Sequence, residues 1–110
     1  MIDRELLELA AKACGVNLWW DGDSPKEIVQ HWSGNPEDGG ETKDYDWNPL
    51  EEDGAALRLA VKINEMRMFI YSDEVSMGCL KIVEKYTGDP MPAARRAIVR
   101  AAAEIGKSMP

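Results

Sequence analysis

The sequence predicts an α+β domain in which a small antiparallel sheet packs against about three helices, in the order α-β(β)-α-β-β-α. Apolar residues recur at helical spacing in residues 3–14, 55–63 and 92–105, whereas β-branched and aromatic runs lie between turn-forming residues elsewhere. These helices and strands are segregated along the chain instead of alternating strictly. With 110 residues, 45% of them hydrophobic, the chain is expected to form one domain over residues 1–110 with a modest core.

Residues 3–14 carry the clearest helical pattern. Asp3 is placed to cap the first amide groups, and Gly15 suits the left-handed residue that follows a helix. Four apolar residues share one face and predict the buried side of this helix: Leu6, Leu7, Ala10 and Cys14.

Residues 16–32 predict a β-hairpin, with one alternative left open. Residues 16–20 are β-branched and aromatic, and Asp21-Gly22 then favours a turn. Residues 28–32 alternate as a returning strand would. However, residues 24–27 have the sequence of a capping box with Pro at the first helical position, so 24–32 also fits the start of a helix. The shortness of the segment and its β-branched residues favour the hairpin.

The net charge of −7 is concentrated in one segment. Residues 36–53 hold eight carboxylates and one cation, whereas the rest of the chain has 12 acids and 12 bases. Residues 33–46 are polar, rich in Gly and acids and almost without apolar side chains, so we expect a flexible, solvated acidic loop there. An acidic flank of this kind repels polyanions and attracts cationic partners.

The second predicted helix, residues 55–63, is apolar on nearly all sides. Only Arg58 and Lys62 form a polar edge, and Asp53-Gly54 provides the helix start. Because a helix with so narrow a polar strip is not expected at the surface, we place it at the centre of the core, against the strands of 66–86. The residues expected to share this core are Leu57, Ala60, Val61, Ile70, Leu80, Ile82 and Ile98.

The last part of the chain predicts two strands and a helix. Residues 66–71 and 77–86 are expected to pair around a turn at 72–74, although the apolar spacing in 75–86 also fits a helix. Pro92 opens a last helix that runs to residue 105 and is closed by Gly106. Its expected buried stripe is Ala94, Ile98, Ala101, Ala102 and Ile105, and its expected solvated face is Arg95, Arg96, Arg100 and Glu104.

Composition and the start of the chain favour a cytoplasmic protein without a membrane partner. The longest apolar stretches are about five residues, far below the roughly 20 that cross a bilayer. The residues after Met1 include acids, where a secretory signal carries cations. In a reducing compartment we expect Cys14 and Cys79 to remain free and to serve as small apolar core residues.

No pattern of catalytic or metal-ligating residues is complete, which argues against an enzyme, a cofactor or a bound metal. His31, Cys14 and Cys79 lack the short spacing of a zinc half-site. Residues 21–32 begin like a calcium loop, but they have Pro at the fifth position and Trp at the twelfth, where a bidentate Glu is needed. Four carboxylates would form a Mg²⁺ site only if the acidic loop folds back: Asp21, Asp23, Asp44 and Asp46.

The four tryptophans lie within the same half of the chain as the acidic segment. Trp19 and Trp20 are expected to face opposite sides of a strand, so at least one of them should lie outside the main core. A Trp rimmed by carboxylates is typical of an interaction surface, whereas the slightly favoured alternative is a satellite cluster of Trp32 and Trp47 under the acidic loop. The predicted protein-binding surface is Trp19, Trp20, Trp47, Asp44, Asp46, Glu51 and Glu52.

Two longer segments stand out: DWNPLEEDGAALRLAVK over residues 46–62 and AARRAIVRAAAEIG over residues 93–106. Together with the helix at 3–14, they resemble a family of small tailed-phage and prophage proteins of unknown function, whereas residues 21–45 share almost nothing with that family. The resemblance implies a bacteriophage-encoded accessory protein that acts in the cytoplasm of the bacterial host. It carries no catalytic residues over to this chain.

These features lead to the hypothesis of a non-enzymatic module that binds a host or phage protein through the acidic, Trp-containing surface. One alternative is a small metal-dependent hydrolase or nuclease that uses the four aspartates, and another is an acidic nucleic-acid mimic that inhibits a host defence complex. Direct binding of nucleic acid is disfavoured despite Arg95, Arg96 and Arg100, because the sequence pI is about 4.7.

Overall fold

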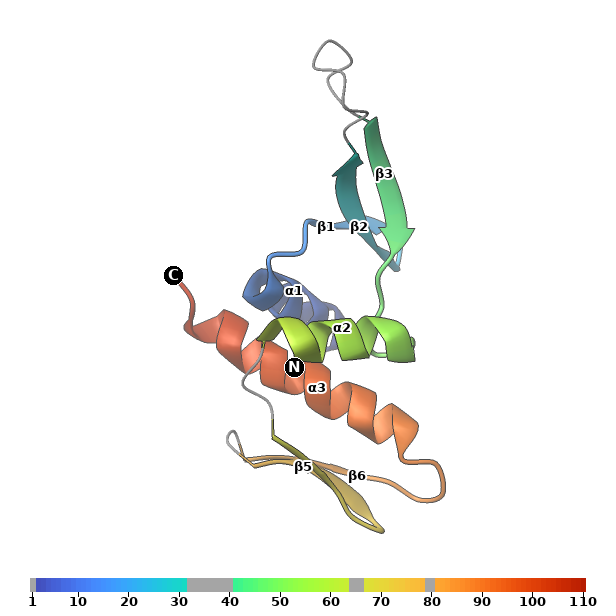
Figure 1. The fold of residues 1–110 in the computed structure, drawn as a ribbon, viewed down its shortest axis with the longest axis vertical. Coiled ribbons are helices and arrows are strands. Elements are labelled where there is room, and N and C mark those ends of the chain that lie inside the picture. Colours follow the sequence, from blue (N-terminus) through green and yellow to red (C-terminus); the bar gives the residue numbers. More distant parts are fainter. Residues whose placement is uncertain (1, 32–40, 64–66, 79–80) are drawn as a thin grey trace.

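A computed structural model of the protein describes residues 2–31, 41–63, 67–78 and 81–110 (Figure 1). Three helices and two antiparallel three-stranded sheets make up this part of the chain, which confirms the predicted α+β class and the order of helices and strands. The helices are α1 (Asp3–Cys14), α2 (Asp53–Ile63) and α3 (Met91–Ser108). The first sheet contains β1 (Leu18–Asp21), β2 (Ser24–His31) and β3 (Glu41–Asp46), and the second contains β4 (Met68–Ile70), β5 (Glu74–Met77) and β6 (Ile82–Lys85).

Helix α1 has the predicted bounds but not the predicted N-cap. Ile2 occupies the N-cap position, and no side chain accepts a hydrogen bond from the first turn there. Asp3 instead pairs with Arg96 of α3, with 2.9 Å between its Oδ1 and Nη2 of the arginine. At the other end, Gly15 adopts the expected left-handed conformation (φ 73°), and its N–H donates to the Ala11 carbonyl.

Strands β1 and β2 form the predicted hairpin around a turn at Gly22-Asp23. Trp19 lies opposite Lys26, and Trp20 lies opposite Pro25. The helical interpretation of residues 24–27 is therefore wrong. This segment pairs with β1 on one side, and β2 pairs with β3 on the other side from Lys26 onward, so strand pairing satisfies more of its backbone groups than an isolated helical turn would.

Residues 41–46, predicted as part of the flexible acidic loop 33–46, form strand β3 instead. This strand pairs with β2 along its whole length, from Asp46 opposite Lys26 to Glu41 opposite His31. Residues 42–46 are all exposed, so the strand buries no apolar side chain and carries no apolar alternation in its sequence. Residues 33–40 of the predicted loop lie outside the described residues.

The second sheet is a three-stranded meander, not the predicted two-stranded hairpin. The predicted turn at 72–74 is confirmed at Ser72-Asp73, across which β4 pairs with β5, and Glu74 already belongs to β5. The predicted long strand 77–86, and its helical alternative over 75–86, are both wrong, because β5 ends at Met77 and β6 begins at Ile82. The chain reverses between these strands, where Lys81 has a left-handed backbone (φ 54°).

Helix α3 is the central element of the fold. One of its faces packs with α1, α2 and Trp47, through Ile98, Val99, Ala102 and Ala103. Another face packs against the second sheet, where Val75, Met77 and Ile82 are buried against a row of alanines. Because the second sheet covers α3 on the side opposite α1 and α2, the helices separate the two sheets (Figure 1). The alanine face consists of Ala93, Ala94, Ala97 and Ala101.

The prediction that α2 is the central helix is wrong. Helix α2 packs against α3 and α1 with Ala56 and Leu59, whereas Leu57 and Val61 are 65% and 69% exposed. The helix is apolar on nearly all sides, yet Leu57 and Val61 face solvent, so an apolar helix surface does not by itself imply burial on every side. Of the predicted core, Ile82 and Ile98 are buried and Ala60 is half-buried; Ile70 is 57% exposed, and Leu80 lies outside the described residues.

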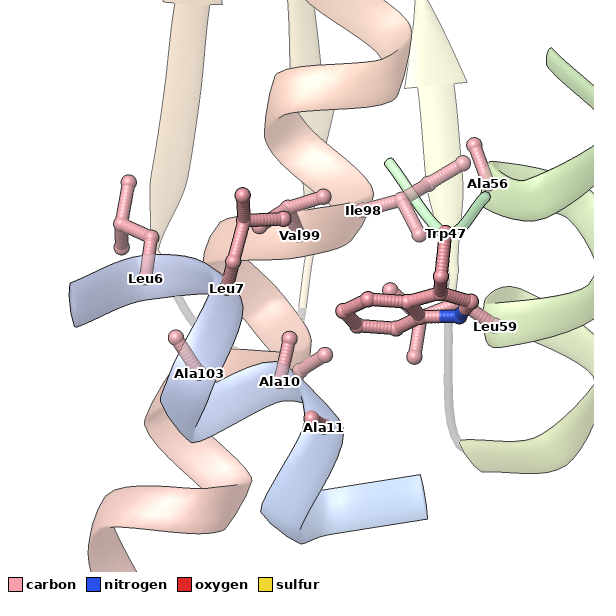
Figure 2. Packing of buried hydrophobic residues seen from close by; sticks show 11 residues of the cluster. Leu6, Leu7, Ala10, Ala11, Trp47, Ala56, Leu59, Ile98, Val99 and Ala103 are labelled. Carbon is pink, nitrogen blue, oxygen red and sulfur yellow. The ribbon is translucent and has the colours of Figure 1, made fainter. Parts of the chain in front are cut away.

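Trp47 belongs to the main core. It is 4% exposed, and Figure 2 shows its indole between α1 on one side and α2 on the other, near Ile98. Its backbone N–H donates to the Pro25 carbonyl, which extends the ladder between β2 and β3 by one residue. Trp47 therefore connects the first sheet to the helices, and its predicted place on a binding surface is wrong.

Helices α1 and α3 approach closely at Gly106. A Cβ atom added there would lie 2.0 Å from the Leu9 carbonyl oxygen, so only glycine fits. The predicted role of Gly106 as the residue that closes the last helix is wrong, because α3 continues to Ser108. The predicted buried stripe of this helix is confirmed except at Ile105, which is half-buried.

Candidate functional site

The predicted binding residues separate into a buried, a half-buried and an exposed group. Trp47 is in the core, whereas Trp19 and Trp20 are half-buried on opposite faces of β1. The carboxylates are all exposed: Asp44 and Asp46 on β3, and Glu51 and Glu52 in the segment that leads into α2.

One face of the first sheet brings part of the predicted surface together. Trp19 is opposite Lys26, which is opposite Asp46, so these three side chains share a face. Ile28 and Asp44 lie two positions along the same face, and Asp21 follows Trp19 by two positions on β1. We call this surface the acidic face; it consists of Trp19, Asp21, Lys26, Ile28, Asp44 and Asp46.

Charge on the acidic face is partly compensated. The Lys26 ammonium group donates a hydrogen bond to Asp46 Oδ1, and this bond is the main reason why the pKa of Lys26 is raised. Within the described residues, no cation pairs with Asp44, so its charge remains available on the same face. The Trp19 indole N–H is shielded from solvent and has no acceptor among the described residues.

The opposite face of the first sheet closes a cleft of about 450 Å³ between the hairpin and the starts of α1 and α3. The Arg4 guanidinium carbon lies 4.3 Å from the centroid of the Trp20 ring, a cation–π contact. Arg4 also pairs with Glu8 at 3.5 Å, and Arg96 pairs with Asp3. Both cations of the cleft are therefore engaged by groups of the protein itself.

The segment between Trp47 and α2 holds Glu51 and Glu52 in a defined turn. The backbone N–H groups of both glutamates donate to the Asn48 carbonyl at 3.0 and 2.9 Å, and the Leu50 N–H donates to Asn48 Oδ1. Arg95 Nε donates to the Leu50 carbonyl at 2.9 Å, which attaches this turn to α3. Glu51 lines the cleft, whereas Glu52 precedes the first turn of α2.

The arginines of α3 form intramolecular ion pairs, so the prediction of a solvated face is wrong for them. Arg95 pairs with Asp53 at 2.7 Å, and Arg100 pairs with Glu84 of β6 at 2.9 Å. Arg96 contacts Asp3 and, at 3.6 Å, Glu84. These cations bind α3 to α1, α2 and the second sheet; their acidic partners lie far away in the sequence, which is why periodicity alone did not indicate the pairs.

The other candidate chemistry is only partly covered by the described residues. In the ranges that the structure describes, no group of three or more His, Cys, Asp or Glu side chains is close enough to hold a metal ion. Cys14 is half-buried with a free thiol whose pKa is raised by burial. The side chain of His31, as well as Trp32 and Cys79, lies outside the described residues.

No protein-family model, curated protein or solved structure matches this chain. Among the described helices, none is long and apolar enough to cross a membrane.

Proposed function

We propose that this protein is a non-enzymatic protein-binding module, a phage-encoded accessory protein that binds a host or phage protein through the acidic face. The observation that carries the proposal is the placement of Trp19 and the exposed Asp44 and Asp46 on one face of the first sheet. A half-buried indole beside exposed carboxylates combines apolar contact area with charge, as binding hot spots do. The phage origin rests on the sequence resemblance.

The charge of this surface defines the chemistry of the partner. Asp44 is exposed and forms no ion pair within the described part of the chain, and Asp21 adds a further exposed carboxylate. A partner with Lys or Arg side chains around an apolar group would neutralise these charges and cover the Trp19 ring.

A cross-linked pull-down from host lysate tests the acidic face with three variants that are first shown to be folded. We expect Asp44→Lys to lose the recovered partner and Trp19→Ala to weaken its recovery, because the first reverses a charge and the second removes contact area. Glu104→Lys is the matched control, since Glu104 is an exposed acid on α3, outside the first sheet. Equal recovery by all three variants and the wild type would show that the acidic face is not the binding surface.

A further inference from the structure

We propose that two copies of this protein associate by antiparallel pairing of their β4 strands, which joins the two second sheets into one six-stranded sheet. The strand β4 is at the edge of its sheet, because the order is β4-β5-β6 and β5 is its only neighbour among the described strands. All three of its residues are exposed, in contrast to Val75 and Met77 of β5, which are 0% and 2% exposed. Exposed apolar edge strands are templates for pairing with another chain.

The backbone of β4 presents its free hydrogen-bonding groups at the open edge. The Tyr71 N–H donates to the Glu74 carbonyl, and the Arg67 carbonyl accepts from the Gly78 N–H. In an antiparallel ladder, alternate residues point their backbone groups to the same neighbour, so Arg67, Phe69 and Tyr71 face β5. The N–H and C=O groups of Met68 and Ile70 therefore point outward, towards a new strand.

This alternation selects one register for a two-fold symmetric pair. Met68 of one copy must lie opposite Ile70 of the other, so that each pair exchanges two backbone hydrogen bonds and Phe69 faces its own symmetry mate. A register shifted by one residue turns the edge groups away from each other. A register centred on Ile70 uses Ser72, which belongs to the turn, so it forms fewer bonds within the strand.

Side chains on both faces of this register are complementary to a second copy. On one face, Phe69 and Tyr71 already stack with 6.5 Å between ring centroids, and pairing would place the same two rings of the second copy beside them. On the other face, Met68 and Ile70, which are 40% and 57% exposed, would contact their counterparts beyond the edge of α3. Arg67 would lie opposite Tyr71 of the second copy and diagonally across from its Asp73, two positions further along the strand.

Charge also favours a second copy as the occupant of this edge. The segment from Arg67 to Tyr86 has three bases and three acids, so two such sheets meet without net repulsion. Neither Arg67 nor Asp73 has an ion-pair partner in the described part of the chain, and the two lie diagonally across from each other in the pair, within reach of a long arginine side chain. The open edge of β3 carries Asp44 and Asp46, so self-pairing there would bring carboxylates together.

Light scattering after size exclusion, from about 10 µM to about 1 mM protein, tests the association. We expect the mass to rise from 12.3 kDa towards twice that value. Phe69→Lys should weaken dimerisation at least about tenfold, because it places two ammonium groups opposite each other. Ile70→Pro should also weaken dimerisation, because it removes an N–H that points towards the second copy and leaves the hydrogen bonds to β5 in place. Val61→Lys, at an even more exposed apolar site on α2, should leave the dimer unchanged.

Disulfide trapping tests the register without relying on weakened variants. In a background with Cys14→Ala and Cys79→Ala, Phe69→Cys should cross-link to its symmetry mate, since Cα atoms of a non-hydrogen-bonded pair are about 4.5 Å apart. Ile70→Cys should not, because two residues of rise plus one strand spacing separate its copies by roughly 8 Å. A monomer at every concentration, a dimer that survives Phe69→Lys, or preferential cross-linking through Ile70→Cys would each overturn the proposal.

Discussion

The two sheets have the same antiparallel three-stranded topology but are attached to the helices in different ways. The second sheet lies flat on α3 and buries Val75, Met77 and Ile82 against its alanines. The first sheet is attached mainly near one end, by Trp47 and Pro25, and its β2 and β3 strands extend away from the helices (Figure 1). A sheet with one covered face needs apolar alternation on its strands, whereas a sheet attached at one end does not.

The edge strands of the two sheets also differ in polarity. One edge strand of the first sheet, β3, carries charged and polar side chains, which is how soluble proteins protect an edge from pairing. One edge strand of the second sheet, β4, is apolar on both faces. The acidic segment therefore protects the β3 edge of the first sheet, whereas the β4 edge of the second sheet has no such protection.

The largest effect should come from removing the residue that joins the first sheet to the helices. Trp47→Ala should lower the free energy of unfolding by about 3–5 kcal/mol, because it empties a space between α1, α2 and α3. Chemical denaturation followed by far-UV circular dichroism measures this. Trp19→Ala is the control on the same sheet and should cost clearly less, since Trp19 is only half-buried. Equal losses would mean that Trp47 is no special attachment point.

Met77→Ala tests the attachment of the second sheet in the same way. Met77 is 2% exposed and packs against α3, so we expect a loss of about 2–5 kcal/mol in the free energy of unfolding. Hydrogen exchange distinguishes the two sheets: amides of β5 and β6 should lose more protection than those of β2 and β3. Uniform loss of protection would show that the two sheets open together and that their separate attachments are irrelevant to local stability.

One ion pair in each sheet offers a finer comparison. Lys26→Met should lower stability by much less than either core truncation, and Lys85→Met should lower it even less, because Lys85 is 71% exposed and lies 3.7 Å from Glu74. The pKa of Lys26 is raised by Asp46, so its contribution should be complete at neutral pH and be lost as pH rises above about 10.5. Thermal melts of both variants at pH 7 and 11 check this. A Lys26 effect that grows with pH would contradict the pairing.

The smallest effect is expected at Leu57, which lies on the solvent-exposed side of α2. Leu57→Ala should change the free energy of unfolding by no more than about 0.5 kcal/mol, because its side chain is 65% exposed. Leu59 lies on the buried side of the same helix and is 2% exposed, so Leu59→Ala should lower the free energy of unfolding by about 2–5 kcal/mol. Urea titration of the two variants compares them directly. A large loss at Leu57 would place the outward face of α2 in a buried interface.

Local patterns were enough to predict α1, α3, the first hairpin and the fold class. Each of these has a strong periodic pattern or a turn signal within a short stretch, such as Asp21-Gly22. Strand β3 was missed because its pairing with β2 supplies its stability, and its own sequence has no apolar alternation. Tertiary pairing can impose a strand on residues whose local preference is for a loop.

The candidate site was predicted in part. Trp19, Asp44 and Asp46 do share a face, but this follows from strand register, which depends on a third strand that the sequence did not indicate. Trp47 was misplaced because a Trp in an acidic segment has no local mark that distinguishes a surface residue from a core residue. The contact of Arg4 with Trp20 joins residues from two elements, so residue spacing along one helix does not reveal it.

The contact at Gly106 also constrains when the main core can form during synthesis. Helix α1 packs against α3 so closely that the two backbones touch at Leu9 and Gly106, almost a hundred residues apart in the sequence. During synthesis, α1 emerges from the ribosome well before α3, so the part of its apolar face that α3 covers stays uncovered until Gly106 has followed. The main core can therefore close only after α3 has emerged, however early α1 folds.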